Sequence, residues 1–143
     1  MIINDNFWKD IDGNYIYSQG GGIFKFGETY YWYGVHYKGA ETYVANPTQK
    51  NDDTTFVSIA IYSCKDLVNW KFENDVLTPK SKGRVEASWV GRIGVTYCSS
   101  SKQYVVVTQH NDNVLFASCS SPTGNFEVEY SRQNSKCIKF RYW

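Results

Sequence analysis

The side chains best suited to contact a ligand stand beside a run of glycines near the start of the chain. Gln19 carries an amide that can donate and accept hydrogen bonds, and Gly20-Gly21-Gly22 follow it directly. Glycines here predict either a bulge or turn in a strand, or bare backbone on which a ligand can lie closely. The chemistry favoured by the second interpretation is hydrogen bonding to a molecule rich in hydroxyl groups.

Four further candidates occur within or at the ends of predicted strands. Trp89 opens a strand and could offer a flat ring on which a ligand stacks, whereas Trp32 could equally be a core residue. His36 closes a strand before a long insertion, where it either contacts a ligand or serves as a surface or hydrogen-bonded residue. Arg92 lies in an apolar strand, so it either touches the ligand or pairs with a partner in the core.

Short β-rich runs separated by turn signals position these residues, and helical periodicity is almost absent. The first group of predicted strands covers residues 22–26, 29–36, 55–63 and 70–73, and the second covers 89–98, 103–109, 113–120 and 126–130. Residues 79–83 form the linker between the groups. The pattern therefore predicts an all-β fold made of two groups of four strands.

The two groups look like one unit repeated. In each, a strand ends in Ser-Cys (Ser63-Cys64 and Ser118-Cys119), a polar turn follows, and an aromatic residue (Trp70 or Phe126) opens the last strand. Four antiparallel strands repeated in this way are typical of β-propeller blades. A β-sandwich would also give short strands and regular turns, but it would not require the same corner twice.

An insertion separates the first unit from the second. Tyr31 and Tyr104 are predicted to correspond, and the extra length of the first unit falls at about residues 37–53. Long ordered loops often carry function, so we expect this insertion to form one wall of a ligand cleft. Glu41 and Tyr43 are its most plausible ligand contacts.

Composition excludes several classes of function. The 143 residues carry a net charge of +1 with no basic stripe before the tail, which argues against nucleic-acid binding. The apolar runs are too short for a membrane span. The first residues lack the features of a signal peptide, so the cellular location stays open. Aromatic residues, at 17% of the chain, favour strands and can also stack on sugar rings.

The four cysteines are widely spaced and form no CxxC pair, which argues against a zinc site. Cys64, Cys98 and Cys119 each fall within or at the end of a strand-like run. We therefore predict that these three are buried free thiols.

Three segments resemble one known family. Gly27-Glu28-Thr29-Tyr30-Tyr31-Trp32-Tyr33-Gly34, the corner at residues 63–70 and Ser121-Pro122-Thr123-Gly124-Asn125-Phe126 resemble motifs of glycoside hydrolase family 43, in order and at the spacing of one blade. The resemblance covers about residues 5–130. Gly20-Gly21-Gly22-Ile23 makes it closest to the galactan 1,3-β-galactosidase branch.

The resemblance implies a five-bladed β-propeller with a sugar pocket at the centre of one face. Residues 1–143 would then be a truncated part of that domain, with one blade at about 18–75, a second at about 85–130 and an atypical tail at 131–143. Two blades cannot close a ring, so open sheet edges and uncovered faces predict that the isolated chain associates with itself.

The family's reaction needs two carboxyl groups about 6.5–9.5 Å apart when the sugar configuration is inverted. The resemblance implies a base in the first blade, where this chain has Gly20, and a supporting carboxylate in the second, where it has Gly91. Glu86 is the nearest acid and our one catalytic candidate; the alternative is a carboxylate at the rim. The catalytic acid is expected in a third blade, which this chain does not supply.

The function expected from the resemblance is hydrolysis of terminal galactose or arabinose from a plant-type polysaccharide. The expected saccharide contacts are Gln19, Gly20, Trp32, His36, Trp89 and Arg92. No metal or organic cofactor is expected, and the partner is an oligo- or polysaccharide. The alternative is a non-catalytic carbohydrate-binding module or remnant. On either interpretation, the chain alone should not turn over aryl galactosides or arabinosides.

Overall fold

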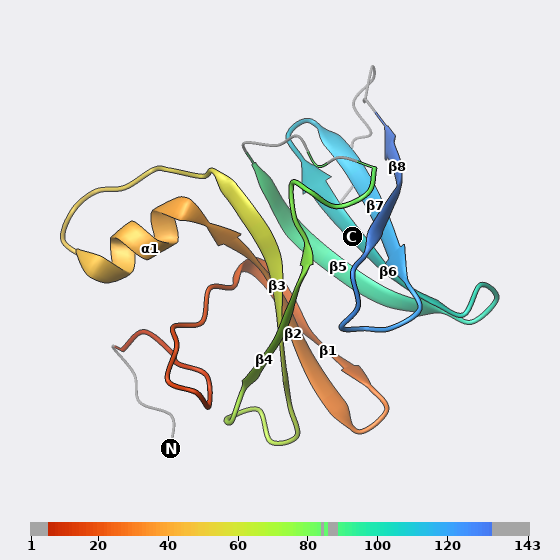
Figure 1. Ribbon diagram of the computed structural model, residues 1–143, viewed down its shortest axis with the longest axis horizontal. Coiled ribbons are helices and arrows are strands. Elements are labelled where there is room, and N and C mark those ends of the chain that lie inside the picture. The colour runs from red at the N-terminus through yellow and green to blue at the C-terminus, as the bar shows by residue number, and fades with distance from the viewer. Residues whose placement is uncertain (1–5, 84, 86–88, 133–143) are drawn as a thin grey trace, which may run out of the picture.

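The computed structural model describes residues 6–83, 85 and 89–132, which form two four-stranded sheets side by side (Figure 1). The first sheet comprises β1 (Gln19–Phe26), β2 (Thr29–Tyr37), β3 (Phe56–Cys64) and β4 (Lys71–Leu77), with helix α1 (Lys38–Ala45) between β2 and β3. The second comprises β5 (Val90–Cys98), β6 (Gln103–His110), β7 (Asn113–Cys119) and β8 (Glu127–Arg132).

Each sheet is an antiparallel meander in which consecutive strands are neighbours. The all-β prediction and the order of the eight strands are confirmed. Each sheet is completed before the next begins, and within the described residues the chain does not return from the second sheet to the first, unlike the Greek-key connections of an immunoglobulin-type sandwich.

Helix α1 was not predicted. It occupies the insertion between β2 and β3 and spans eight residues, two of which, Gly39 and Lys38, donate backbone hydrogen bonds to Asp53 and Thr55. A helix this short is marginal by its own propensity and depends on contacts with the rest of the fold. Two turns are also too few for helical periodicity to show in the sequence.

Strand register confirms that the sheets are repeats of one unit. The row Gly22–Tyr33–Ile61 across the first sheet corresponds to Gly94–Val107–Phe116 across the second, because each row adjoins a bulge in its first strand. The same side-chain hydrogen bond recurs, from Ser63 Oγ to Glu73 (2.6 Å) and from Ser118 Oγ to Glu129 (2.7 Å). One predicted correspondence was wrong by one residue. Tyr104 pairs with Cys119 in the second sheet, and the residue that pairs with the equivalent Cys64 in the first sheet is Tyr30, not Tyr31.

One hydrophobic core joins the two sheets. The face of the first sheet that carries Tyr33, Ile59 and Ile61, here called the Tyr33 face, packs on the face of the second that carries Val106 and Leu115. Phe126, only 1% exposed, closes this contact with its ring edge-on to Tyr33 and its N–H donating to Val76 O at 2.8 Å. The Tyr33 hydroxyl donates to Pro122 O at 2.5 Å.

The opposite face of the first sheet, here called the Trp32 face, is covered by the N-terminal segment (Figure 1). Trp32 lies there in an aromatic cluster with Tyr62 and Trp70, and Trp8 of the N-terminal segment packs edge-on against it. The backbone N–H of Ile11 donates to Trp70 O at 2.8 Å, which fixes the segment on this face. Trp32 is partly buried in this cluster, as the core-packing interpretation expects.

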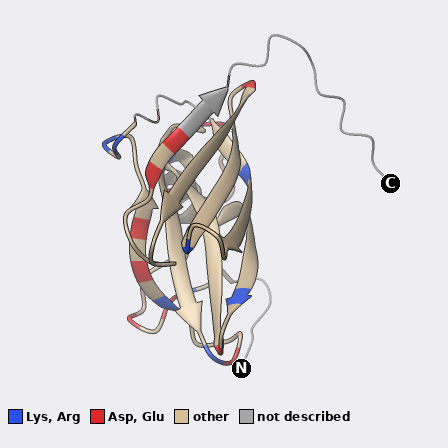
Figure 2. Cartoon of the chain, turned by 90° about the vertical axis from the view of Figure 1, so that its right-hand side faces the viewer, with Lys and Arg blue, Asp and Glu red and all other residues tan. Residues whose placement is uncertain are grey.

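Acidic residues lie along the outer strands β4 and β8 (Figure 2). These strands carry Glu73, Asp75, Glu127 and Glu129, whereas β1 and β5 lie against each other at the inner side. Charged outer strands resist edge-to-edge pairing with other sheets.

The prediction of buried cysteines is confirmed for Cys64 but is wrong for Cys98 and Cys119, which are only partly buried. Cys98 stands at the end of β5, where Ser100 and Ser101 hydrogen bond to its sulfur and lower the pKa of the thiol to about 7. All three cysteines in the described residues are free, and Cys137 lies outside them. No helix among the described residues is long and apolar enough to cross a membrane.

Candidate functional site

Matching bulges in β1 and β5 lie next to each other at the end where both strands begin. The β1 bulge falls between Gln19 and Gly22, and the β5 bulge falls between Gly91 and Gly94. A Cβ placed on Gly20 would lie 3.5 Å from the backbone nitrogen of Arg92, so the two bulges are in contact. We call this region the bulged end.

Left-handed backbone occurs at the same position in both bulges. Gly20 has φ 60° and Arg92 has φ 55°. Glycine adopts this conformation freely, but for an arginine it costs about 1–2 kcal/mol, which the surrounding structure must offset. The Arg92 side chain is exposed, so the alternative that it pairs with a partner within the core is wrong. The Arg92 side chain is therefore accessible to solvent at the bulged end.

Gly21 is required for a different reason. A Cβ at this position would lie 1.7 Å from the carbonyl oxygen of Tyr33 in β2. No side chain fits between the two strands here, whereas a Cβ on Gly20 would make only ordinary van der Waals contact with Arg92 and Gly91. The glycine run therefore shapes the bulge and leaves exposed backbone at the surface of the bulged end.

Trp89 stands directly before β5 and is half-buried. Its indole covers Gly91 so closely that a Cβ on that glycine would lie 2.9 Å from Trp89 Cζ2. The carbonyl of Trp89 accepts a hydrogen bond from Asn111 N at 3.0 Å, and Thr108 Oγ1 donates to Gly91 O at 2.7 Å. Neighbouring strands thus hold the start of β5, and with it the tryptophan, in a fixed position.

A cavity of about 360 Å³ opens beside Gln19, between the start of β1 and α1. Its lining residues are Gln19, Tyr37, Gly39, Ala40, Tyr43, Asn51, Asp52, Asp53 and Thr54. The Tyr37 hydroxyl donates to Val90 O, which ties this cavity to the start of β5. The insertion thus forms a wall beside the bulged end, with Tyr43 on the cavity. Glu41 is instead paired with Lys38 and His36.

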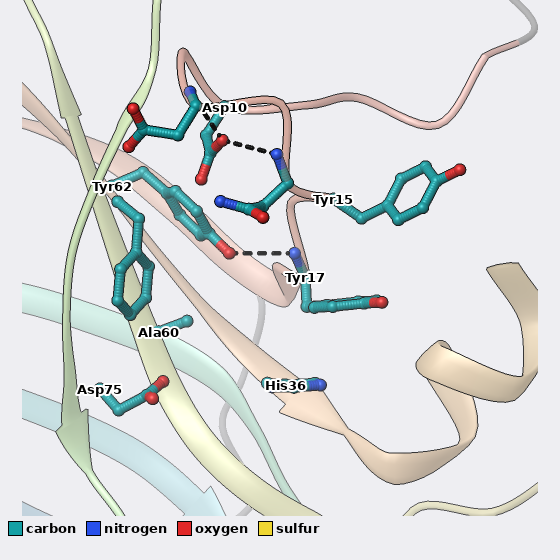
Figure 3. Close-up of a pocket in the computed structure, with 10 residues that line it drawn as sticks. Asp10, Tyr15, Tyr17, His36, Ala60, Tyr62 and Asp75 are labelled. Carbon is teal, nitrogen blue, oxygen red and sulfur yellow. Dashed lines mark hydrogen bonds between the residues drawn. The ribbon is translucent and has the colours of Figure 1, made fainter.

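His36 follows Val35, the register partner of Gln19, but its side chain lies on the Trp32 face. It lines a second cavity of about 330 Å³ together with Asp10, Tyr15, Tyr62 and Asp75 (Figure 3). Its ring stacks on Tyr17 with centroids 4.3 Å apart, and its Nε2 lies 3.1 Å from Glu41 Oε1. Burial lowers the pKa of His36, and the nearby carboxylate of Glu41 only partly opposes this effect.

The His36 environment predicts a pH dependence of stability. Because the folded-state pKa lies below the ordinary value of about 6.5, the unfolded chain takes up the proton first as the pH falls. The contribution is fully present above pH 6.5 and is lost as the pH drops below it. Urea unfolding at a series of pH values should show a shallower loss for His36→Gln than for the wild type. Equal slopes would contradict this assignment.

The structure brings some predicted site residues together and separates others. Gln19, Gly20, Trp89 and Arg92 lie at the bulged end, whereas Trp32 and His36 lie on the Trp32 face. Glu86 lies outside the described residues. The one feature of the bulged end that sequence reasoning missed is the left-handed Arg92, since no glycine marks it.

Comparison with known proteins identifies relatives by structure. No family model matches the sequence, and no curated protein matches it. Several solved structures do. An exo-β-1,3-galactanase from Clostridium thermocellum is 28% identical to this chain, with a TM-score of 0.73. The match covers 91% of this chain and 27% of the galactanase chain. The Phanerochaete chrysosporium exo-β-1,3-galactanase E208A with β-1,3-galactotriose is 26% identical with a TM-score of 0.76, covering 92% and 30%.

A GH43 β-1,3-galactosidase with galactodeoxynojirimycin is also similar, at 26% identity and a TM-score of 0.68, covering 91% of this chain and 38% of its own. The chain therefore spans about a quarter to two fifths of the length of these structures. These matches confirm the resemblance to glycoside hydrolase family 43 and to its 1,3-β-galactosidase branch.

Proposed function

From its kinship with family 43 β-1,3-galactosidases, we propose that this chain forms the first two blades of a five-bladed propeller of the glycoside hydrolase lineage. Blade 1 covers about residues 18–75 and blade 2 about 85–130. The lineage's reaction is removal of terminal galactose or arabinose from a plant-type polysaccharide. Relatives solved with β-1,3-galactotriose and galactose support galactose as the sugar.

The proposed saccharide site is the bulged end. The observation that carries this proposal is the contact between two homologous bulges, one of bare glycine and one presenting an exposed arginine. Gln19 and Arg92 supply hydrogen-bond donors, Trp89 supplies the ring for stacking, and Gly20 keeps the backbone open. A sugar has apolar ring faces and hydroxyl rims, which this combination of groups complements.

Catalysis requires carboxylates. At the two positions where the family resemblance implies them, the bulged end carries glycines instead, namely Gly20 and Gly91. We propose Glu86 as the supporting carboxylate of blade 2, with the catalytic acid contributed from outside the chain. The two glycines also favour the alternative, a module that binds saccharide without cleaving it. On both proposals the chain alone binds but does not hydrolyse, so aryl galactosides should stay intact in its presence.

Saccharide binding and its dependence on Trp89 can be measured by isothermal titration calorimetry with β-1,3-galactotriose. Trp89→Ala should weaken binding about tenfold, equivalent to about 1.4 kcal/mol, because it removes the stacking surface. Trp8→Ala is the matched control, since Trp8 is a partly exposed tryptophan on the other side of the first sheet. Absence of binding by the wild type, or equal losses in both variants, would refute the proposal.

A further inference from the structure

The cavity between the start of β1 and α1 adjoins the bulged end directly. Gln19 lines this cavity, and the next residue, Gly20, lies against Arg92 where the two bulges meet. The Tyr37 ring also lines it, while the Tyr37 hydroxyl donates to Val90 O at the start of β5. Its volume of about 360 Å³ lies at the lower end of the range for ligand pockets, about 300–1,000 Å³. A saccharide bound at the bulged end therefore has this cavity beside it.

Hydrogen bonds hold the outer wall of the cavity in place. The segment at residues 51–54 closes on α1, where the Gly39 N–H donates to Asp53 O at 3.1 Å. Asn51 joins both sides, because its Nδ2 donates to Gly39 O and its Oδ1 accepts from Asp53 N at 2.9 Å. A Cβ on Gly39 would lie 2.3 Å from Asp53 O, so only glycine permits this closure. The segment and the helix therefore form one preformed wall.

Tyr43 gives this wall an exposed aromatic ring. It belongs to α1, lines the cavity and is 47% exposed. Phe7 of the N-terminal segment packs edge-on against it, with ring centroids 5.5 Å apart, which fixes the orientation of the Tyr43 ring. Together with Trp89 at the start of β5, the region offers two rings, and successive sugar units each have an apolar face that such a ring can cover.

The charges of the cavity favour an uncharged ligand. Asp52 and Asp53 line it, and none of the described residues that line it carries a positive charge. Hydrogen bonds from Thr55 lower the pKa of Asp53, so this carboxylate is ionised at neutral pH. Lys38 does not line the cavity and is paired with Glu41. Carboxylates accept strong hydrogen bonds from sugar hydroxyl groups but repel the carboxylate of a uronic acid.

We propose that this cavity binds a second, neutral sugar unit of the saccharide held at the bulged end and disfavours a uronic acid in the same place. The proposal rests on the proposed function, since the first unit must occupy the bulged end. Tyr43 stacks on the second unit, and Asp52 and Asp53 accept hydrogen bonds from its hydroxyl groups. The insertion between β2 and β3 thus makes the chain prefer neutral saccharides over acidic ones.

Affinities for galactose and for β-1,3-galactobiose test the second-unit site. The wild type should bind the disaccharide about tenfold more tightly, because only the disaccharide reaches both rings. Tyr43→Ala should weaken disaccharide binding about fivefold and so remove most of this difference. Tyr97→Ala is the matched control, because Tyr97 is 45% exposed and stands near the other end of β5. Equal affinities of the wild type for the two sugars, or equal effects of the two variants, would overturn the proposal and leave the bulged end as the saccharide site.

The charge preference is tested with galactobiose in which one unit, in separate preparations, is oxidised to galacturonic acid. The preparation that places its acid in the cavity should bind about fivefold more weakly than neutral galactobiose. Asp52→Asn should reduce this penalty, whereas Asp12→Asn, an exposed carboxylate on the second cavity, should leave it unchanged. No penalty in either preparation, or a penalty unaffected by Asp52→Asn, would overturn the preference. Absence of all binding, galactose included, would refute the proposed function as well.

Discussion

Replacing Phe126 with alanine should lower the free energy of unfolding by about 3–5 kcal/mol, the range for a large aromatic side chain deleted from a core. Phe126 is 1% exposed, packs against Tyr33 across the two sheets, and its N–H donates to Val76 O. The loss is large because the cavity would open at the contact that joins the sheets. Urea unfolding followed by circular dichroism gives the value.

Tyr97→Ala is the matched control for this measurement. Tyr97 is 45% exposed, so its truncation should cost about 1 kcal/mol or less. If the two sheets were independent units, Phe126→Ala would instead produce two separate transitions, with the first sheet unaffected. That result, or a loss no larger than that of the control, would contradict the single shared core.

Replacing Gly21 with alanine should disrupt the innermost strand of the first sheet. The new Cβ would meet the Tyr33 carbonyl oxygen at 1.7 Å, and backbone on both strands must move to relieve this. We expect a loss of about 3 kcal/mol or more, at the upper end of the range for overpacking. The measurement is again the free energy of unfolding in urea.

Gly20→Ala separates steric exclusion from the general cost of losing a glycine. A Cβ on Gly20 has its nearest neighbour at 3.5 Å, so only the left-handed φ of 60° opposes the change. This variant should lose about 1–2 kcal/mol. Equal losses in the two variants would show that the close approach of β1 and β2 at Gly21 is not the cause.

The strands were predictable because turn residues and short apolar runs mark their ends. The Ser-Cys corner before Trp70 and Phe126 also revealed the repeat, since the same local chemistry builds the same corner twice. Helix α1 escaped prediction because eight residues carry little periodicity and its stability comes from contacts with Asp53 and Thr55.

The candidate site was predictable only in part. Gly20-Gly21-Gly22 signalled the first bulge, but the second, at Gly91–Gly94, depends on the left-handed Arg92, which no sequence rule anticipates. Strand alternation shows that Trp32 and His36 share one face of β2. It does not show that this face lies under the N-terminal segment, because that depends on how distant parts of the chain pack.

Nuclear magnetic resonance titration with β-1,3-galactobiose tests the central claim that the bulged end binds saccharide. The backbone amides of Gln19, Gly20, Gly21 and Arg92, with the indole N–H of Trp89, should shift together and saturate at one ligand concentration. The amides around Phe72 in the outer strand β4 should remain unchanged. Shifts confined to the Trp32 face, or no shifts at saturating sugar, would contradict the account.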